Sequence, residues 1–511
     1  MRSHKLLALL FCLITGPALA GYMTLLGAGL GAIQPVAQSN FIQSSYSANL
    51  ADLNAVATFS RVGNAMQFDS LGYLTYGPNN LLLNTATLGT QTVTVQVGVN
   101  YILSIKGTGS VTLTGASTAG PLNGTGASNR VDLKITAATT SLTLTVSGSV
   151  TSARLSAVTY ETAFRACDDV DNTASAYYGP RFDYTYNGSS WVPAGLLVEG
   201  AATNFYLQSN NLTNGATSVV GLTRSTDGTL GPDGVSPMTK MLATAGAGQR
   251  EYYRSTTVVS GTTYTASTFV KKGNHRYVFI TYEIATGLNG IIAIFDLDNP
   301  SAATQTFSTG GGSLTTYGII NEGGGIYRIY VTGSVTLGNT TGFMVAGFID
   351  AATGNPTTST EPAFTSAGTE YTYFFGAQFE AGNLSSYTPT GASAVTRAAE
   401  IVQSTGAALS AVQGANWSAF IEFADVQSYA GNPSLFDNSS NVQAVFMNGA
   451  QAAFFPTSLN TANNLSVAAT HRVGVSATRT GGRSIVSDGS TVATDATAMT
   501  APVNNYIGSN V

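Results

Sequence analysis

Imidazole and carboxylate groups are the side chains that could carry acid–base catalysis, and this chain holds few of them. Of its 511 residues, 26 are Asp or Glu, 21 are Lys or Arg and 3 are His. His275 and His471 fall in different predicted modules, so they cannot share a site unless those modules pack together. No G-x-S-x-G or H-E-x-x-H pattern occurs. We expect both histidines to lie in turns or at the surface, and we expect no enzymatic activity.

Paired carboxylates are the other arrangement that could cleave a glycosidic bond. Glu199, Glu251, Glu283 and Glu380 lie in the middle of the chain. Glu199 and Glu380 stand where the first and last strands of that region would pair. A carboxylate at such a position accepts hydrogen bonds from backbone N–H groups or from Arg, so we expect these residues to be structural.

An oxygen-rich cluster stands at Asp168, Asp169, Asp171 and Asn172. Calcium takes six to eight oxygen ligands, so this stretch could hold a structural Ca²⁺ ion, although its spacing is not that of an EF-hand. The alternative is a solvated acidic linker. We expect no other cofactor.

Sugar binding would require aromatic rings that stack on the sugar, with polar side chains nearby to bond its hydroxyls. Most aromatic rings in a sandwich fill its core or cover an edge, which is the competing interpretation of each ring. The candidate residues for a carbohydrate site are Trp191, Tyr252, Tyr253, Tyr282 and Tyr317, with Arg250 and Arg254 beside the first tyrosine pair.

The composition indicates which elements carry these side chains. Only 9% of residues are charged, whereas 43% are hydrophobic and 57 are Gly. A net charge of −5 leaves no basic surface for phosphates, so we expect no nucleic-acid partner. Exposed helix faces normally need Lys, Glu and Arg, so a helical bundle is excluded. Thr, aromatic residues, Gly and Asn together favour short strands joined by tight turns.

Short alternating runs of residues confirm this preference along the chain. Polar and apolar residues alternate with a period of two, and Gly or Asn separates the runs. We therefore predict an all-β chain of tandem antiparallel β-sandwich (jelly-roll) modules with a small non-β N-terminal segment. The predicted strands include 91–107, 109–115, 140–161, 262–272, 276–284, 290–298, 325–335, 341–350 and 370–380.

Two stretches of the chain echo each other, which indicates two related modules of unequal length. Asn80 to Thr85 reads NLLLNT and Asn204 to Ser209 reads NFYLQS, and each is followed by a Tyr three residues before a Ser. The stretch EIVQSTGAALSAVQG predicts one or two helical turns.

The predicted divisions are 1–20, a signal-like peptide; 21–56, an attachment segment; 57–165, a small sandwich; 166–199, a linker; 200–400, a larger jelly roll; and 401–511, a third sandwich.

The amino end has the layout of a secretory signal peptide. Arg2 and Lys5 precede an apolar stretch, and Ala18-Leu19-Ala20 is a small-x-small cleavage pattern. The alternative is an uncleaved apolar anchor, although the glycines after Gly16 make a poor spanning helix. Cleavage would leave Cys167 as the only cysteine, so we expect no intrachain disulfide.

A series of motifs runs in order from residue 180 to residue 402. It consists of PRFDYTYNGSSWVPAGLLVEGAATNFYLQS, then TTYTASTFVKKGNHRYVFI, Phe295-Asp296-Leu297, Gly324-Gly325-Ile326-Tyr327-Arg328, and FFGAQFEAGNLSSYTPTGASAVTRAAE. In these motifs the chain resembles a β-sandwich family of tailed-phage tail, fibre and head-spike proteins, whose jelly roll is similar to carbohydrate-binding modules. Ile326 stands where the family usually has Trp, which puts a sugar-stacking role there in doubt. The first module looks like a short version of the same unit.

The carboxyl-terminal region carries an early WSAFIEF strand, HRVGVSATR and a Ser-Asp-Gly turn at 487–489. In these features it looks like a laminin-G or concanavalin-type lectin sandwich. Because the chain stops at Val511, we expect this sandwich to be incomplete or completed by another chain. The resemblances imply a non-enzymatic virion appendage that binds bacterial surface polysaccharide, contacts other virion proteins and assembles as a homo-oligomer, a trimer. The alternatives are a secreted polysaccharide-binding protein or enzyme accessory, and a structural virion decoration without a ligand.

Overall fold

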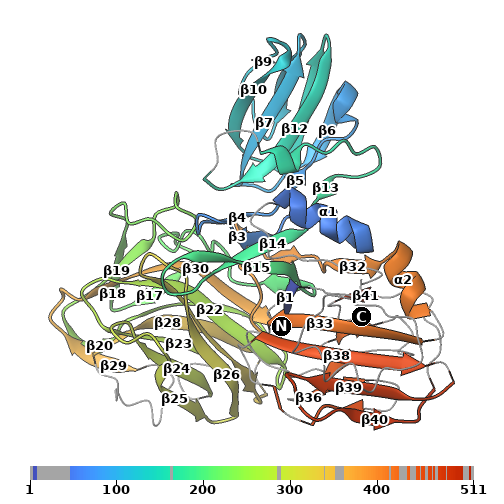
Figure 1. The fold of residues 1–511 in the computed structure, drawn as a ribbon. Helices are drawn as coiled ribbons and strands as arrows, with labels where there is room; N and C mark the ends of the chain where they lie inside the picture. The colour runs from blue at the N-terminus through green and yellow to red at the C-terminus, as the bar shows by residue number, and fades with distance from the viewer. Residues whose placement is uncertain are drawn as a thin grey trace.

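The chain folds into three β-sandwich bodies, which Figure 1 shows as a small one above two larger ones. All of the paired strands are antiparallel within the part of the chain that is described, and this confirms the predicted all-β class with small helical additions. The computed structural model describes residues 4–8, 46–160, 165–284, 289–338, 340–350, 362–413, 416–424, 434–437, 445–448, 451–454, 459–462, 464–465, 470–478, 480–498 and 506–507.

The small sandwich pairs a three-stranded sheet with a four-stranded sheet. Two of its strands, Ser110–Gly115 and Ser141–Ser147, alternate buried Val or Leu with more exposed Thr or Ser, as the period-two pattern predicts, whereas Asn100–Gly107 is buried at most positions. One sheet has the order β10 (Gly126–Thr136), β7 (Asn100–Gly107), β12 (Val150–Val158), and the other β6 (Gln91–Thr94), β11 (Ser141–Ser147), β8 (Ser110–Gly115), β9 (Leu122–Asn123).

The jelly roll packs two six-stranded sheets against each other, and its long strands also match the predicted runs. The first sheet has the order β17 (Ser218–Val220), β21 (Glu251–Thr257), β28 (Thr341–Ile349), β23 (Tyr277–Ile284), β24 (Gly290–Asp296), β25 (Ala303–Thr309). The second has the order β18 (Leu222–Ser225), β19 (Thr239–Ala243), β30 (Tyr371–Ala381), β22 (Thr263–Lys272), β27 (Ile326–Val335), β26 (Gly312–Asn321), and β20 (Gly246–Gln249) pairs with β29 (Ala363–Ser366) at one edge.

The third sandwich takes its strands from separate parts of the chain. Its two seven-stranded sheets share one core, to which Phe182, Val402 and Trp417 all contribute. One sheet has the order β14 (Arg181–Tyr186), β15 (Trp191–Val198), β1 (His4–Ala8), β33 (Asn416–Ala424), β38 (Thr470–Thr478), β39 (Arg483–Ser487), β40 (Ala493–Asp495). The other has the order β2 (Ala57–Ser60), β32 (Ile401–Ser404), β41 (Tyr506–Ile507), β34 (Ser434–Asp437), β35 (Val445–Asn448), β36 (Gln451–Phe454), β37 (Leu459–Asn460).

Two α-helices lie beside this third sandwich. Helix α1 (Tyr46–Val56) buries Asn49, Leu53 and Val56, which recur at three- and four-residue spacing on one helical face. Helix α2 (Gly406–Gln413) confirms the helical turns predicted in this stretch. Two short 3₁₀ helices, η1 (Thr85–Thr87) and η2 (Ala166–Asp168), belong to the small sandwich. No helix in the described part of the chain has both the length and the hydropathy needed to span a membrane.

The small sandwich and the jelly roll are insertions into the third sandwich. The small sandwich begins and ends at a paired stem, β5 (Asn79–Asn80) with β13 (Tyr177–Tyr178). The jelly roll begins and ends at a second stem, β16 (Ala202–Asn204) with β31 (Val395–Arg397). Strand β2 therefore lies in the third sandwich and not in the small sandwich. Residues 181–198, expected to be a linker, form the β14–β15 hairpin of the same body.

The two matching stretches of sequence form the same hydrogen-bonding arrangement in both modules. The Asn80 amide donates to Ala153 O and Val170 O, and its oxygen accepts from the Leu82 and Leu155 N–H groups. Asn204 makes the same four bonds, to Ala377 O and Thr388 O and from the Tyr206 and Phe379 N–H groups. Each buried asparagine thus clamps the last strand of its module to the first, which identifies the two modules as versions of one unit.

The clamp extends to the segment that closes each module. Asn84 and Gln208, four residues after the clamp asparagine, both have positive φ, and their N–H groups donate to Asn172 O at 2.7 Å and Gly391 O at 2.8 Å. In the same way Arg154 bonds a Ser hydroxyl and a closing-segment carbonyl, as Arg328 does in the jelly roll. The acidic stretch around Asp171 is therefore the closing segment of the small sandwich.

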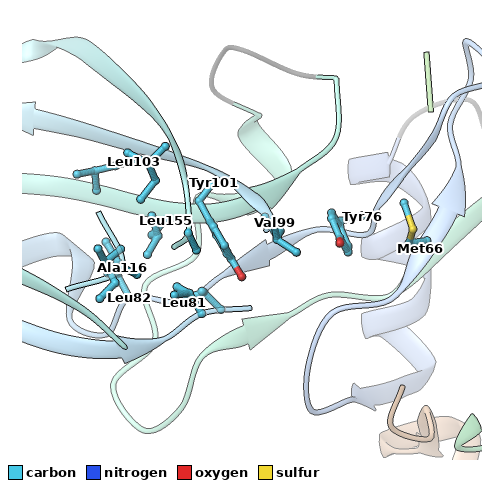
Figure 2. Close-up of a cluster of buried hydrophobic side chains, with 14 of the residues drawn as sticks. Met66, Tyr76, Leu81, Leu82, Val99, Tyr101, Leu103, Ala116 and Leu155 are labelled. Carbon is cyan, nitrogen blue, oxygen red and sulfur yellow. The ribbon is translucent and has the colours of Figure 1, made fainter. Parts of the chain in front are cut away.

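One apolar cluster joins the small sandwich to the jelly roll. It runs from Leu103 and Leu155 in the small sandwich, through Met66 and Tyr76, to Phe375 in the jelly roll. Figure 2 shows Met66 and Tyr76 extending this cluster away from the packed residues of the small sandwich. Met66 and Tyr76 belong to a short hairpin, β3 (Met66–Phe68) and β4 (Leu74–Tyr76), which lies between the two bodies.

Candidate functional site

The tip of the β3–β4 hairpin presents apolar side chains at the meeting point of the bodies. The Asp69 carboxylate accepts hydrogen bonds from the Leu71 and Tyr73 N–H groups, both at 2.9 Å. Gly72 takes a positive φ of 86° within this tight turn, a conformation that favours glycine. The turn is thus held by its own backbone, and it leaves Leu71 68% exposed and Tyr73 38% exposed.

Tyr73 is supported from both inserted bodies. Its ring lies 4.7 Å from the ring of Tyr160, which follows the last strand of the small sandwich, and the Tyr160 hydroxyl donates to the Asp69 carboxylate. Under the Tyr73 ring lies Gly234 of the jelly roll, where a Cβ atom would come within 2.4 Å of the ring. The Leu74 N–H donates to Pro232 O at 2.9 Å and anchors the hairpin to the same loop.

Trp191 lies on the other side of the turn. It stacks on Phe68 with centroids 4.8 Å apart and packs beside Tyr186 at 5.8 Å. Gly72 and Gly323 approach its ring so closely that a Cβ atom would lie 2.0 Å and 3.2 Å from its indole nitrogen, respectively. Trp191 and Tyr186 nevertheless remain partly exposed, because the β14–β15 hairpin carries them at the edge of the junction.

We call the partly exposed side chains Leu71, Tyr73, Tyr160, Tyr186 and Trp191 the junction aromatic surface. The four aromatic side chains are held by packing or hydrogen bonds, so they would lose little conformational entropy on binding. Exposed hydroxyl and amide groups border it at Ser70 and in the turn 187–190. Flat aromatic faces next to neutral hydrogen-bonding groups are suited to a sugar ring. Of these residues, sequence reasoning found only Trp191.

Two of the predicted aromatic candidates are core residues. Tyr252 is fully buried and its hydroxyl donates to Thr268 Oγ1 at 2.8 Å, and burial raises its pKa well above the usual value. Tyr282 is also fully buried, packed against Tyr264 and Phe379. Neither ring has a face open to a ligand, which corrects their assignment as stacking platforms. The alternating pattern placed Tyr282 in a strand but could not tell which face is covered, and it gave no strand at Tyr252, which lies in β21.

The remaining predicted candidates lie apart from the junction aromatic surface. Arg250 is buried, with its guanidinium over the Phe364 ring and donating to Gln249 O and Gly246 O, so it serves the fold. Arg254 donates to Ala216 O at 2.6 Å. Tyr253 is half-buried and packs edge-on to Phe343. Tyr317, on the edge strand β26, is 42% exposed.

The aspartates of the predicted calcium site bind different partners within the protein. Buried Asp168 bonds the side chains of Arg154 and Arg165. Asp169 pairs with Arg130 at 3.2 Å, and the Asp171 carboxylate accepts from the Thr85 N–H at 2.6 Å. Within the described residues no group of three or more His, Cys, Asp or Glu is placed to hold a metal ion. The carboxylates close the small sandwich, a role that neither the calcium nor the linker interpretation anticipated.

The side chains considered as catalytic candidates also form hydrogen bonds within the fold. The Glu199 carboxylate bonds Arg181 and Ser386, and Glu380 accepts from Ser385 and Gln378, which confirms the predicted structural role of both glutamates. His275 lies in the turn between β22 and β23, as predicted, but it is buried, with Nε2 2.6 Å from Ile349 O. His471 lies in β38 and is also buried, with Nδ1 2.6 Å from the Asp488 carboxylate, so a surface position is wrong for both histidines.

Comparison with known proteins gives no family for this chain. No protein-family profile and no curated protein matches it. Among solved structures it is similar to the N-terminal CBM22-1-CBM22-2 tandem domain from Paenibacillus barcinonensis Xyn10C, at 12% identity and a TM-score of 0.23. That match covers 63% of this chain and 93% of the other. At so low a TM-score it carries no argument about fold or function.

Proposed function

We propose that this chain is a non-enzymatic glycan-binding protein that contacts sugar through the junction aromatic surface. The observation that carries the proposal is the set of partly exposed rings, Tyr73, Tyr160, Tyr186 and Trp191, held in place where the bodies meet. A non-catalytic role is supported by the hydrogen bonds that already occupy the carboxylates of Glu199 and Glu380. The scarcity of charged residues supports it further.

The finer proposal is that the protein is displayed on a tailed-phage virion and binds bacterial surface polysaccharide. The motif series from 180 to 402 supports this assignment. Each glycan contact would be weak, and an oligomer would strengthen binding by raising the effective concentration of sites. A secreted polysaccharide-binding protein is the second candidate, favoured by the signal-like layout of Met1 to Ala20, and cleavage there would remove β1 from between β15 and β33. An intact Met1 in purified particles supports the virion, and cleavage after Ala20 supports secretion.

Binding of the full chain to an array of bacterial surface glycans tests the proposal. We expect Tyr73→Ala to weaken binding about 2- to 13-fold, since an aromatic contact contributes about 0.5–1.5 kcal/mol. Tyr317→Ala is the matched control, because Tyr317 is the same residue type with similar exposure and lies on β26, outside the junction aromatic surface. We expect this control to bind like the unmodified chain. Equal affinity of both variants, or no glycan binding by the chain or its oligomer, would contradict the proposal.

A reducing-sugar assay on the same polysaccharides separates binding from cleavage. We expect no release of sugar. Release that disappears on substitution of a carboxylate pair would identify an enzyme instead.

A further inference from the structure

Five charged side chains meet in a fully enclosed cluster where the bodies join. Arg61 follows β2, Arg181 opens β14, Glu199 follows β15, Arg397 ends β31 and Glu400 precedes β32. Their side chains are 0–1% exposed in every pair that they form. They thus come from the third sandwich and from both ends of the jelly-roll insertion. We call them the buried arginine cluster.

Arg181 is the centre of the buried arginine cluster. Its Nε and Nη2 each lie 2.7 Å from an oxygen of Glu400, and Nη2 lies 2.6 Å from Glu199 Oε2. Its Nη1 donates to Met66 O at 2.6 Å and to Ser386 Oγ at 2.8 Å. Every N–H-bearing atom of this guanidinium is therefore hydrogen-bonded.

The other two arginines are not fully bonded. Arg61 bonds Glu400 through Nη1 and Gly63 O through Nε, but its Nη2 is buried without a hydrogen-bond partner. Arg397 reaches Ala398 O with Nη1, whereas its Nε and Nη2 are buried and lack a partner, Nε lying 3.5 Å from Glu199 Oε2. A buried guanidinium N–H without an acceptor costs about 1–3 kcal/mol, so it normally has one.

The charges of the buried arginine cluster do not balance. Burial alone would raise the pKa of Glu400, but Arg181 and Arg61 beside it hold that pKa below its usual value. Burial also opposes ionisation of Glu199, and there Arg397 and Arg181 reverse the effect and lower its pKa. Both glutamates are therefore ionised near neutral pH, and three guanidinium groups face two carboxylates. Burial lowers the pKa of Arg61, and Glu400 opposes this effect, whereas Arg181 and Arg397 nearby add to it.

We propose that a small monovalent anion, chloride in ordinary solutions, binds against the unpaired N–H groups of Arg61 and Arg397. One negative charge would neutralise the excess guanidinium, which a water molecule cannot do, and a divalent anion would reverse the imbalance. A halide can accept several N–H bonds at once, as these partnerless donors require. The buried position of all five side chains favours an ion of few atoms.

Crystals of the full chain soaked in bromide test the site directly. We expect an anomalous peak within hydrogen-bonding distance of Arg61 Nη2 and Arg397 Nη2. A water molecule at this position with no bromide, or no density, would overturn the proposal. This measurement needs no variant, so it remains decisive if substitutions in the buried arginine cluster prevent folding.

Thermal unfolding gives the solution test. At constant pH and ionic strength, replacing gluconate by chloride should raise the melting temperature of the unmodified chain by about 2–5 °C. Arg397→Met removes the excess charge and should abolish this shift. Arg254→Met, which removes a guanidinium outside the cluster, should retain it. A chloride shift that is equal in the unmodified chain and in Arg397→Met would show a general salt effect and contradict the proposed site.

Discussion

The clamp asparagines show how much one side chain contributes to a module that has no disulfide. Asn80 and Asn204 are buried and use both the oxygen and the nitrogen of the amide, four hydrogen bonds each. The sequence echo located both residues, because their neighbours also match. Apart from the nearby Leu82 and Tyr206 N–H groups, their partners could not be predicted, since they lie 73 to 184 positions further along the chain.

We predict that Asn204→Ala destabilises the protein by about 2–3 kcal/mol. It leaves the Tyr206 and Phe379 N–H groups and two carbonyls buried without their partner. Denaturant unfolding measures the change. The control is Asn129→Ala, at an exposed asparagine with one long bond of 3.4 Å, which should have little effect. A loss for Asn204→Ala no larger than that of the control would contradict the clamp role.

Individual strands could be predicted because every second residue of a strand faces a core. The sequence did not show whether the opposite face of each sheet is also covered. Both faces of the β23 sheet are packed: Tyr282 joins the main core, and Phe279 joins a second cluster on the opposite face. Alternation therefore gives no sign of exposure in these strands, and Tyr252 and Tyr282 looked like surface candidates. The β3–β4 hairpin was missed altogether because its strands have three residues each, too short for a periodic pattern.

We predict that one added methyl group at Gly234, which lies under the Tyr73 ring, disturbs the β3–β4 turn. Gly234→Ala places a Cβ atom 2.4 Å from a Tyr73 ring atom and should displace that ring and weaken glycan binding. The control is Gly228→Ala in the same loop, because Gly228 also has a positive φ, of 85° against 72°, but no atom lies within 4 Å of its Cβ position. Both variants bear the left-handed cost of about 1–2 kcal/mol. Equal glycan affinities for the two variants would contradict this role of Gly234.

The whole molecule is a third sandwich with two bodies inserted into it, and this arrangement was not predictable from the linear pattern. Residues 57–60 carry an ordinary strand signal, yet they pair with β32, beyond both insertions. The β14–β15 hairpin is local, but β15 also pairs with β1, on the other side of the small sandwich in the sequence. Sequence proximity therefore favoured a division into consecutive modules. The buried arginine cluster is the physical counterpart of the insertion, because Arg181, Glu199 and Glu400 come from the strands on either side of the jelly roll.

We predict that acid weakens the buried arginine cluster, where the bodies meet, and so lowers the stability of the protein. The folded pKa values of Glu199 and Glu400 lie below the ordinary value of 4.5, so both carboxylates stabilise the fold above that pH. This contribution is lost as the pH falls below about 4.5 toward the folded pKa values. The free energy of unfolding, measured with denaturant, should fall steeply there and change little between about pH 5 and 7.

Glu400→Gln tests the source of this acid sensitivity. It should lower stability at pH 7 by about 3–5 kcal/mol and flatten the decline in acid, since one of the titrating groups is gone. Asp298→Asn, which changes the same charge in the exposed pair with Lys272, should keep the steep decline. An undiminished decline in Glu400→Gln would place the acid-sensitive groups elsewhere.

The two stems have a consequence for how such a chain can vary. Ala202 pairs with Arg397 and Asn80 with Tyr177, so each inserted body leaves the chain beside the point where it enters. A segment whose ends adjoin can be exchanged for another of any length without stretching or reordering the recipient. Chimeras should accordingly be joined within the stems. A cut near residue 165 would instead separate the small sandwich from its closing segment. A cut near residue 199 would divide the buried arginine cluster. In either case the transferred body would lack contacts that hold its two ends together.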